Sequence, residues 1–116
     1  MKLRVECERG RDVSLAMKVE IKGEVLAIGE IEQLGAENCQ AFRDQVYSAW
    51  SDDLKQVEVD LSCTTFLDSC GLGALISLYK TAALRNGKVR VVNPSPRVQR
   101  LLDVTRMHRV FEIVRS

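Results

Sequence analysis

Residues 57–73, VEVDLSCTTFLDSCGLG, predict a buried strand, a polar loop and the first turn of a helix, in that order. Val57, Val59 and Leu61 alternate with acidic and polar residues, as in a strand that buries one face. From Ser69 onward, apolar residues recur at spacings of three and four, which aligns them in one stripe along a helix. The stretch therefore predicts that the strand ends near residue 62 and that Ser69 lies at a helix N-terminus.

A serine at a helix N-terminus is open to two interpretations. The first N–H groups of a helix lack partners and, with the helix dipole, favour an anion, so a phosphate attached to Ser69 would be well placed. Alternatively, Asp68 or Ser69 simply caps the helix, while Gly71 and Gly73 allow a tight turn or close packing. Taken alone, the local pattern favours the cap, because short motifs often match by chance.

The elements around this stretch predict an α/β order. The alternation over residues 15–21, a turn at Lys22-Gly23 and a strand that ends at Gly29 indicate a β-hairpin. A first helix is expected over residues 36–50, with Cys39 and Trp50 on its apolar face. The second helix is expected to end at Asn86-Gly87, with the glycine left-handed. A strand over residues 88–92, a third helix begun by Asn93-Pro94-Ser95-Pro96 and a strand over residues 110–114 complete the order.

The longer stretch over residues 67–113 resembles the STAS family, specifically the bacterial anti-sigma factor antagonists. It carries an acid, a serine, a small residue and Gly-Leu-Gly at a helix start, then a glycine turn, a strand and the Pro-initiated helix NPSPRVQRLLDVT. Upstream, the resemblance extends to a Gly-Glu-Leu-Asp-like element that leads into the first helix; its residues are Gly29, Glu30, Ile31, Glu32 and Ala36. The match covers about residues 16–114.

The sequence departs from the family pattern at two positions. Cys70 follows the serine, where the family usually has Ser or Thr, and Glu32 replaces the usual Asp. A competing register for the upstream element is Gly23-Glu24-Val25, but Gly29 places the acid and Ala36 correctly.

The resemblance implies a fold and a domain organisation. We expect an α/β fold with a STAS-like mixed β-sheet, an N-terminal hairpin and three main helices packed mostly on one face. The STAS domain should span residues 16–116, and residues 1–15 should form an N-terminal extension or an extra edge strand.

The resemblance also implies a function without catalysis. Unmodified, the protein would bind an anti-sigma factor that is also a serine kinase and carries ATP, and would thereby release a sigma factor. Phosphorylation of Ser69 would end the binding, and a phosphatase would reset it. Partner contacts would come from the acids and the helix start: Glu32, Asp68, Ser69, Cys70, Gly71, Leu72 and Gly73. The alternative is a non-catalytic STAS scaffold or sensory module of a stress-signalling or transport complex.

Composition limits the other classes of function. A chain of 116 residues with 46% apolar and 28% charged residues is typical of one globular domain, which we expect to be a monomer or weak dimer. Its 17 basic and 16 acidic residues are dispersed, which disfavours nucleic-acid binding. No run approaches the roughly 20 apolar residues of a membrane span, and the charged N-terminus does not resemble a secretory signal. We therefore expect a cytoplasmic protein that binds no membrane.

The sequence offers little support for an enzyme, a metal site or a cofactor. The spacing of Cys7, Cys39, Cys63 and Cys70 is not that of a zinc or redox site. Gly71-Leu72-Gly73 is only a fragment of a phosphate-binding loop. A third reading makes Cys70 a nucleophile, because a helix N-terminus lowers a thiol pKa, but His108 is the single histidine and is distant in sequence. We expect no catalysis and no cofactor.

Overall fold

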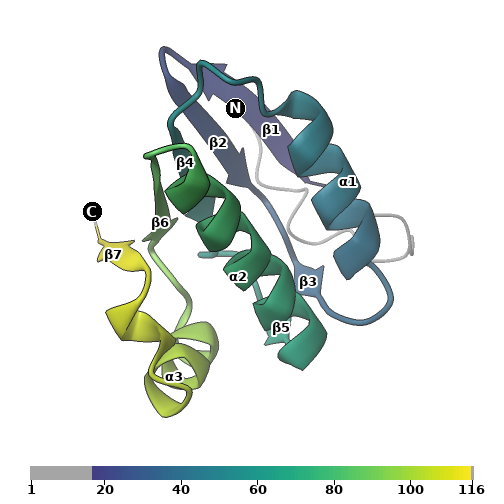
Figure 1. The fold of residues 1–116 in the computed structure, drawn as a ribbon. Helices are drawn as coiled ribbons and strands as arrows, with labels where there is room; N and C mark the ends of the chain where they lie inside the picture. The colour runs from purple at the N-terminus through teal and green to yellow at the C-terminus, as the bar shows by residue number, and fades with distance from the viewer. Residues whose placement is uncertain (1–16, 116) are drawn as a thin grey trace.

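A five-stranded sheet with the order β1-β2-β4-β6-β7 forms the centre of the protein (Figure 1). The computed structural model describes residues 17–115. The hairpin strands β1 and β2 are antiparallel, and the other neighbours are parallel. The strand bounds are β1 Lys18–Lys22, β2 Val25–Gly29, β4 Gln56–Asp60, β6 Lys88–Val92 and β7 Glu112–Val114. The predicted hairpin and mixed sheet are confirmed.

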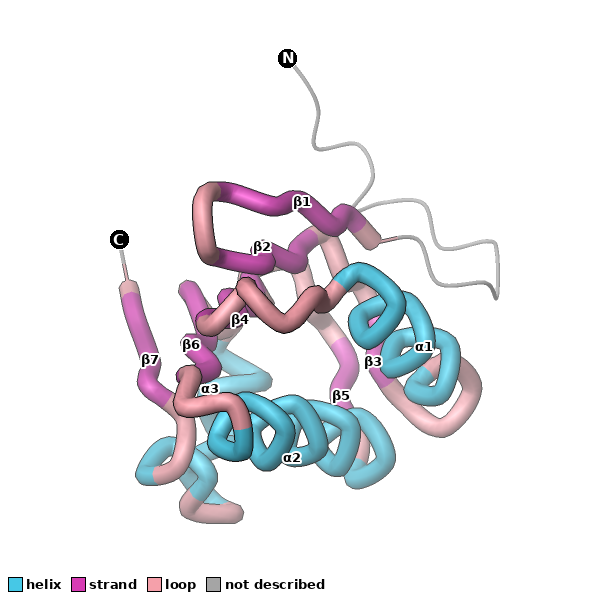
Figure 2. The backbone as a smooth tube through the Cα atoms, turned by 45° about the horizontal axis from the view of Figure 1, so that its top comes forward, coloured by secondary structure: helices cyan, strands magenta, loops and turns pink. Residues whose placement is uncertain are grey.

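Three helices connect successive parallel strands of this sheet. They are α1 Cys39–Ala49, α2 Ser69–Leu84 and α3 Pro96–Val104, and a short 3-10 helix, η2 Met107–Arg109, precedes β7. The strand order advances in one direction from β2 to β7, so right-handed crossovers place every connecting helix on the same face. Figure 2 shows α1 and α2 lying along one side of the sheet.

The core lies between this face of the sheet and the helices. Apolar side chains from the middle strands and from all three helices are buried there, including Leu26, Ile28, Val57, Val59, Val89, Val91, Phe42, Val46, Leu75, Leu78, Val98 and Leu102. In contrast, Ile21 on the edge strand β1 is 59% exposed, although its alternation with polar residues suggested an inward side chain. The alternation of apolar and polar residues is the same in edge strands and in middle strands. Only in a middle strand are the inward side chains fully covered by the helices.

Trp50 is an anchor between the end of α1 and the end of α2, as expected for an apolar-face residue. Its side chain is buried, and its Nε1–H donates a hydrogen bond to the Leu54 carbonyl, 2.8 Å away. The Arg85 guanidinium lies over the ring at 4.7 Å. Both the indole N–H and the ring face of Trp50 are therefore in contact with other residues of this protein.

The end of α2 differs from the prediction in one respect. The left-handed residue is Asn86, with φ of 59°, and not Gly87. The Gly87 N–H donates to the Ala82 carbonyl at 2.7 Å, which closes a Schellman-type turn. A Cβ on Gly87 would lie 1.8 Å from the Lys55 carbonyl oxygen. The glycine is therefore needed for close approach to the chain before β4, and asparagine takes the strained conformation.

Among residues 17–115, no helix is long and apolar enough to span a membrane. No group of three or more His, Cys, Asp and Glu side chains suited to a metal ion occurs in the same part of the chain. The suggested edge strand over residues 1–15 lies outside the described residues.

Candidate functional site

A pair of two-residue strands outside the main sheet holds the loop before α1 against the start of α2. These strands, β3 Gln33–Leu34 and β5 Phe66–Leu67, are parallel. The pairing extends at both ends, because the Thr65 N–H donates to the Glu32 carbonyl at 2.9 Å and the Asp68 N–H donates to the Leu34 carbonyl at 3.4 Å. Two segments that are more than 30 residues apart in sequence are thus fixed side by side.

Asp68 is the N-cap of α2 and also holds the facing loop. One carboxylate oxygen, Oδ1, accepts the Gly71 N–H at 2.9 Å, and the other, Oδ2, accepts the Ala36 N–H at 3.1 Å. The Gly71 hydrogen bond is the main cause that holds the pKa of Asp68 below its ordinary value of 3.8, opposed by partial desolvation and assisted by the bond from Ala36. Asp68 is therefore a carboxylate at neutral pH and is bonded on both oxygens.

Ser69 is the first residue of α2, and its side chain takes no part in this bonded network. It is exposed, and its hydroxyl forms no hydrogen bond with any residue in the range 17–115. The interpretation that Asp68 or Ser69 caps the helix is therefore confirmed for Asp68, which supplies the cap, and not for Ser69. Cys70 is exposed beside it as a free thiol. The outer surface of the first turn thus presents an unengaged hydroxyl.

Gly71 and Gly73 lie on opposite sides of this turn. A Cβ on Gly71 would lie 2.2 Å from the Leu34 carbonyl oxygen and 2.7 Å from Leu67 Cδ1. A Cβ on Gly73 would approach only Arg43 Nη2, at 3.9 Å. We expected both glycines to serve recognition more than folding, but Gly71 is required for packing of the loop on the helix. Gly73 has room for a side chain, so the lack of a Cβ at this position leaves the surface of α2 open.

The loop over residues 35–38 is built by its own hydrogen bonds, which delay the start of α1. Asn38 Oδ1 accepts the Gly35 N–H, and Asn38 Nδ2 donates to the Gln33 carbonyl, both at 2.9 Å. The N-cap is Asn38, whose backbone is not helical with φ of −133°, so α1 begins at Cys39 and not at the predicted Ala36.

This loop and β5 line a cavity of about 450 Å³ beside the start of α2. Phe66 on its rim is 46% exposed, although it is a large apolar side chain. The sequence did not identify Phe66, Gly35 or Asn38 as site residues. The sequence carries no signal for Phe66, because it lies in a two-residue strand whose alternation is too short to show which face is outward. The cavity is lined by Gln33, Gly35, Ala36, Glu37, Asn38, Phe66 and Asp68.

The structure separates the remaining predicted residues. Glu32 is half-buried and faces Thr65 across the beginning of the β3–β5 pair, whereas Ala36 is the residue bonded to Asp68 beside Ser69. Leu72 is only 8% exposed and belongs to the core. Gly29 ends β2 and Gly23 occupies the hairpin turn with φ of 64°, so the preferred register of the upstream element agrees with the structure.

His108 is engaged away from the Cys70 thiol. It lies in η2, and its Nδ1 is 3.3 Å from the Leu102 carbonyl oxygen and 3.8 Å from Asp103 Oδ1. A cysteine nucleophile at Cys70 therefore gains no imidazole base from this ring in the structure.

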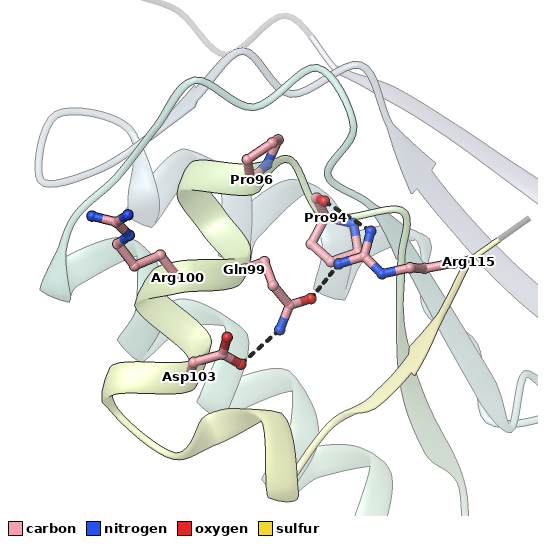
Figure 3. A pocket seen from close by; sticks show the side chains of 6 residues that line it. All are labelled: Pro94, Pro96, Gln99, Arg100, Asp103 and Arg115. Carbon is pink, nitrogen blue, oxygen red and sulfur yellow. Dashed lines mark hydrogen bonds between the residues drawn. The ribbon is translucent and has the colours of Figure 1, made fainter.

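A second cavity, of about 430 Å³, lies between α3 and the end of β7 (Figure 3). Its polar groups are bonded to one another, since Arg115 donates to Gln99 and to the Pro94 carbonyl, and Gln99 donates to Asp103. Arg100 points away from this chain of bonds in Figure 3. Arg97, Arg106 and Arg109 nearby are exposed to solvent.

Comparison with known proteins gives relatives of one kind. The family model described as STAS domain matches residues 16–116. A STAS-domain containing protein of Pseudomonas aeruginosa (strain UCBPP-PA14) is 34% identical over 74 residues, which cover 64% of this chain and 72% of that protein. The anti-sigma F factor antagonist of Paenibacillus polymyxa is 25% identical over 113 residues, which cover 97% of this chain and 87% of that protein.

Solved structures show the same fold. An anti-sigma factor antagonist from Mycobacterium paratuberculosis matches with a TM-score of 0.76 and 22% identity, over 88% of this chain and 86% of that one. The antagonist SpoIIAA matches in its unphosphorylated form with a TM-score of 0.73, 18% identity and coverage of 84% and 87%. Its phosphorylated form, from Bacillus, matches with a TM-score of 0.68, 17% identity and coverage of 84% and 90%. The chain belongs to the STAS domain family.

Proposed function

We propose that this protein is an anti-sigma factor antagonist whose binding to an anti-sigma factor is switched by phosphorylation of Ser69. The observation that carries the proposal is the position of Ser69, exposed and without a hydrogen bond at the start of α2, while Asp68 performs the capping. A serine that stabilised the helix would be engaged, so this hydroxyl is available for a partner. Relatives named as anti-sigma factor antagonists support the choice of partner class.

The proposed modification is a phosphoryl transfer from ATP held by the partner. The Ser69 Oγ attacks the γ-phosphorus, a new O–P bond forms, the bond to the β-phosphate oxygen breaks, and ADP leaves. The hydroxyl proton passes to a base of the kinase. This chain supplies only the nucleophilic oxygen, on a rigid helix start where an exposed side chain can enter a kinase site. A phosphatase would hydrolyse the ester and restore the hydroxyl.

The switch follows from the charge that is added. A phosphoserine carries about 1.5 to 2 negative charges and three acceptor oxygens at neutral pH, next to the Asp68 carboxylate. A partner surface that accepts a neutral hydroxyl in contact would have to bury this near-dianion without compensation. The partner should therefore release the modified protein and become free to hold its sigma factor.

The contact surface would centre on the outer side of the α2 start and on the adjacent cavity. Ser69, Cys70 and Gly73 provide a polar surface with little steric obstruction, and Phe66 adds exposed apolar area next to it. Glu32, at the other end of the β3–β5 pair, would contribute to the edge of the interface. Because the kinase carries ATP, the proposed setting is the cytoplasm, and the proposed action involves no catalysis by this chain.

The proposal is tested by phosphate transfer from the cognate serine kinase with ATP. Mass spectrometry should find one phosphate, on Ser69, and Ser69→Ala should remove it while still binding the kinase. Cys70→Ala serves as the matched control, since it alters the neighbouring exposed side chain without removing the hydroxyl. Phosphate on another residue, or unchanged kinase binding after modification, would overturn the proposal.

A further inference from the structure

The helices α1 and α2 lie side by side with their N-termini at the same end (Figure 1). The Tyr47 hydroxyl is 2.6 Å from Ser77 Oγ and 3.1 Å from Thr81 Oγ1. One turn earlier on both helices, Arg43 Nη2 is 3.9 Å from the position that a Cβ on Gly73 would occupy. The two helices therefore pair turn by turn.

Ser69 precedes Gly73 by four residues and so lies on the same side of α2. Side chains at such positions are about 5–6 Å apart at Cβ, and helical side chains lean toward the N-terminus. The Arg43 guanidinium thus lies about one helical turn from the Ser69 side chain, over a glycine that places no atoms between them. An arginine side chain that spans this distance can reach a phosphate, which extends the serine outward.

Within residues 17–115, Arg43 differs from the other half-buried arginines because its charge has no ion-pair or aromatic partner. Its Nε is buried without a hydrogen bond, and Arg43 forms no ion pair with any of the described residues. Arg90 Nε is likewise buried without a hydrogen bond, but Arg90 lies 3.4 Å from Glu58 and 3.5 Å from Glu112, and Arg85 lies over Trp50. A partly buried guanidinium without a partner is costly to desolvate, so an anion bound through its Nη groups would offset part of that cost.

We infer that Arg43 is the internal receptor for a phosphate on Ser69, an inference that rests on the proposed function. The guanidinium offers a planar pair of donors that matches two phosphate oxygens. It also offsets the repulsion from the Asp68 carboxylate, whose oxygens are bonded to Gly71 and Ala36. The modified side chain is thereby held on the protein's own surface, on the side of α2 that faces Arg43 of α1.

The test uses protein in which phosphoserine is incorporated at position 69 during translation, so that no kinase is needed. Phosphorus-31 NMR then follows the second ionisation of the phosphate, whose ordinary pKa is about 6. We expect Arg43→Gln to raise this pKa by about half a unit or more, because the charged form loses its cation. The phosphate pKa in Arg43→Lys should lie between those in wild type and in Arg43→Gln, because lysine retains the charge but not the fork of donors.

Arg100→Gln is the matched control. It removes the same charge from an exposed side chain on α3, so it should leave the phosphate pKa unchanged. The acidic side chains that face this region, Asp68 of the cap, Glu37 of the loop and Asp44 of α1, are the same in all variants. An equal pKa in wild type and Arg43→Gln, or equal shifts in Arg43→Gln and Arg100→Gln, would overturn the inference.

The two proposals fail in different ways. If Ser69 is never phosphorylated by a kinase, the proposed function is lost, but the titration of the synthetic phosphoprotein still reports on Arg43. If the titration shows no effect of Arg43, the inference that Arg43 binds the phosphate is refuted, while the proposed phosphorylation switch is unaffected. Unmodified Arg43→Gln should melt near the wild-type temperature, because Arg43 makes no hydrogen bond in the described structure.

Discussion

The inner and outer sides of the first turn of α2 are made of adjacent residues with opposite roles. On the inner side, Asp68 is bonded to two backbone N–H groups and Gly71 touches the Leu34 carbonyl, so both fix the loop to the helix. On the outer side, Ser69 forms no hydrogen bond with any residue in the range 17–115, and a Cβ on Gly73 would meet only Arg43 Nη2, at 3.9 Å. The difference shows that one short motif can hold residues that fix the fold beside residues that remain open to a partner. The helical period decides on which side of α2 each residue lies.

The largest effect on stability is expected at Gly71. Gly71→Ala places a Cβ 2.2 Å from a backbone oxygen, so the loop or the helix must shift, at a cost of about 1–3 kcal/mol in the free energy of unfolding. Urea denaturation measures this cost. The matched change Gly73→Ala should be neutral or slightly stabilising, since alanine favours a helix by about 0.5–1 kcal/mol over glycine. Equal losses at the two glycines would remove the distinction between the sides.

Gly73 is expected to matter for binding instead. Gly73→Val should reduce both partner binding and phosphorylation of Ser69, because a branched side chain rises from the open surface between Ser69 and Arg43. Phosphorylation rate and melting temperature are measured on the same sample. A large fall in stability with unchanged phosphorylation of the folded fraction would assign Gly73 to packing.

Asp68 should contribute a pH-dependent part of stability. Its pKa is lowered in the folded state, so its contribution is present above the ordinary value of 3.8 and is lost as the pH falls through the folded value. Asp68→Ala should lower the melting temperature by a few degrees at pH 7, and the gap to wild type should begin to narrow near the ordinary pKa of 3.8 and close as the pH falls through the lowered folded value. A gap that persists in acid would show that the carboxylate charge is not the cause.

Ser69→Asp should weaken partner binding less than true phosphorylation does. A carboxylate supplies one charge and two oxygens, whereas a phosphate supplies about 1.5 to 2 charges and three oxygens. Calorimetric titration of one partner with wild type, Ser69→Asp and phosphoprotein should rank the affinities in that order. Equal affinities for all three would remove the electrostatic explanation of the switch.

The smallest effect on stability is expected at Ser69 itself. Ser69→Ala should change the free energy of unfolding by less than about 0.5 kcal/mol, because the hydroxyl is exposed and does not cap α2. A cap residue would cost about 0.5–2 kcal/mol. Thermal and urea unfolding decide between these values. A loss in the range of a cap residue would show that Ser69 stabilises the start of α2, as Asp68 does.

The sequence predicted most of the fold because its signals are local and repeated. The alternation at Val57 and Val59, the stripe of α2 and the Pro96 start of α3 each produced the expected element. It did not distinguish Asp68 from Ser69 as the cap, because both residue types accept that role and only the backbone geometry selects one. It also placed the start of α1 three residues early, since the Asn38 backbone leaves the helical conformation and no residue pattern marks that change.

The candidate site was predictable only in its centre. The family pattern identified Ser69 and its neighbours, and the structure then divided those neighbours between the core, the loop contact and the open surface. Phe66 and Arg43 carry no signal in one sequence, because their importance depends on what lies across from them. Their positions follow from the β3–β5 pair and from the turn-by-turn pairing of α1 with α2.

The most direct test of the central claim is the affinity of the cognate anti-sigma factor for this protein with and without a phosphate on Ser69. Isothermal titration calorimetry should use the unmodified chain, the phosphoserine-69 chain and Ser69→Ala, all checked for equal folding. We predict similar affinities for the unmodified chain and Ser69→Ala, and at least about a tenfold loss for the phosphoprotein, which corresponds to about 1.4 kcal/mol. Equal affinity of the modified and unmodified chains would contradict the claim that the outer side of α2 is a switch.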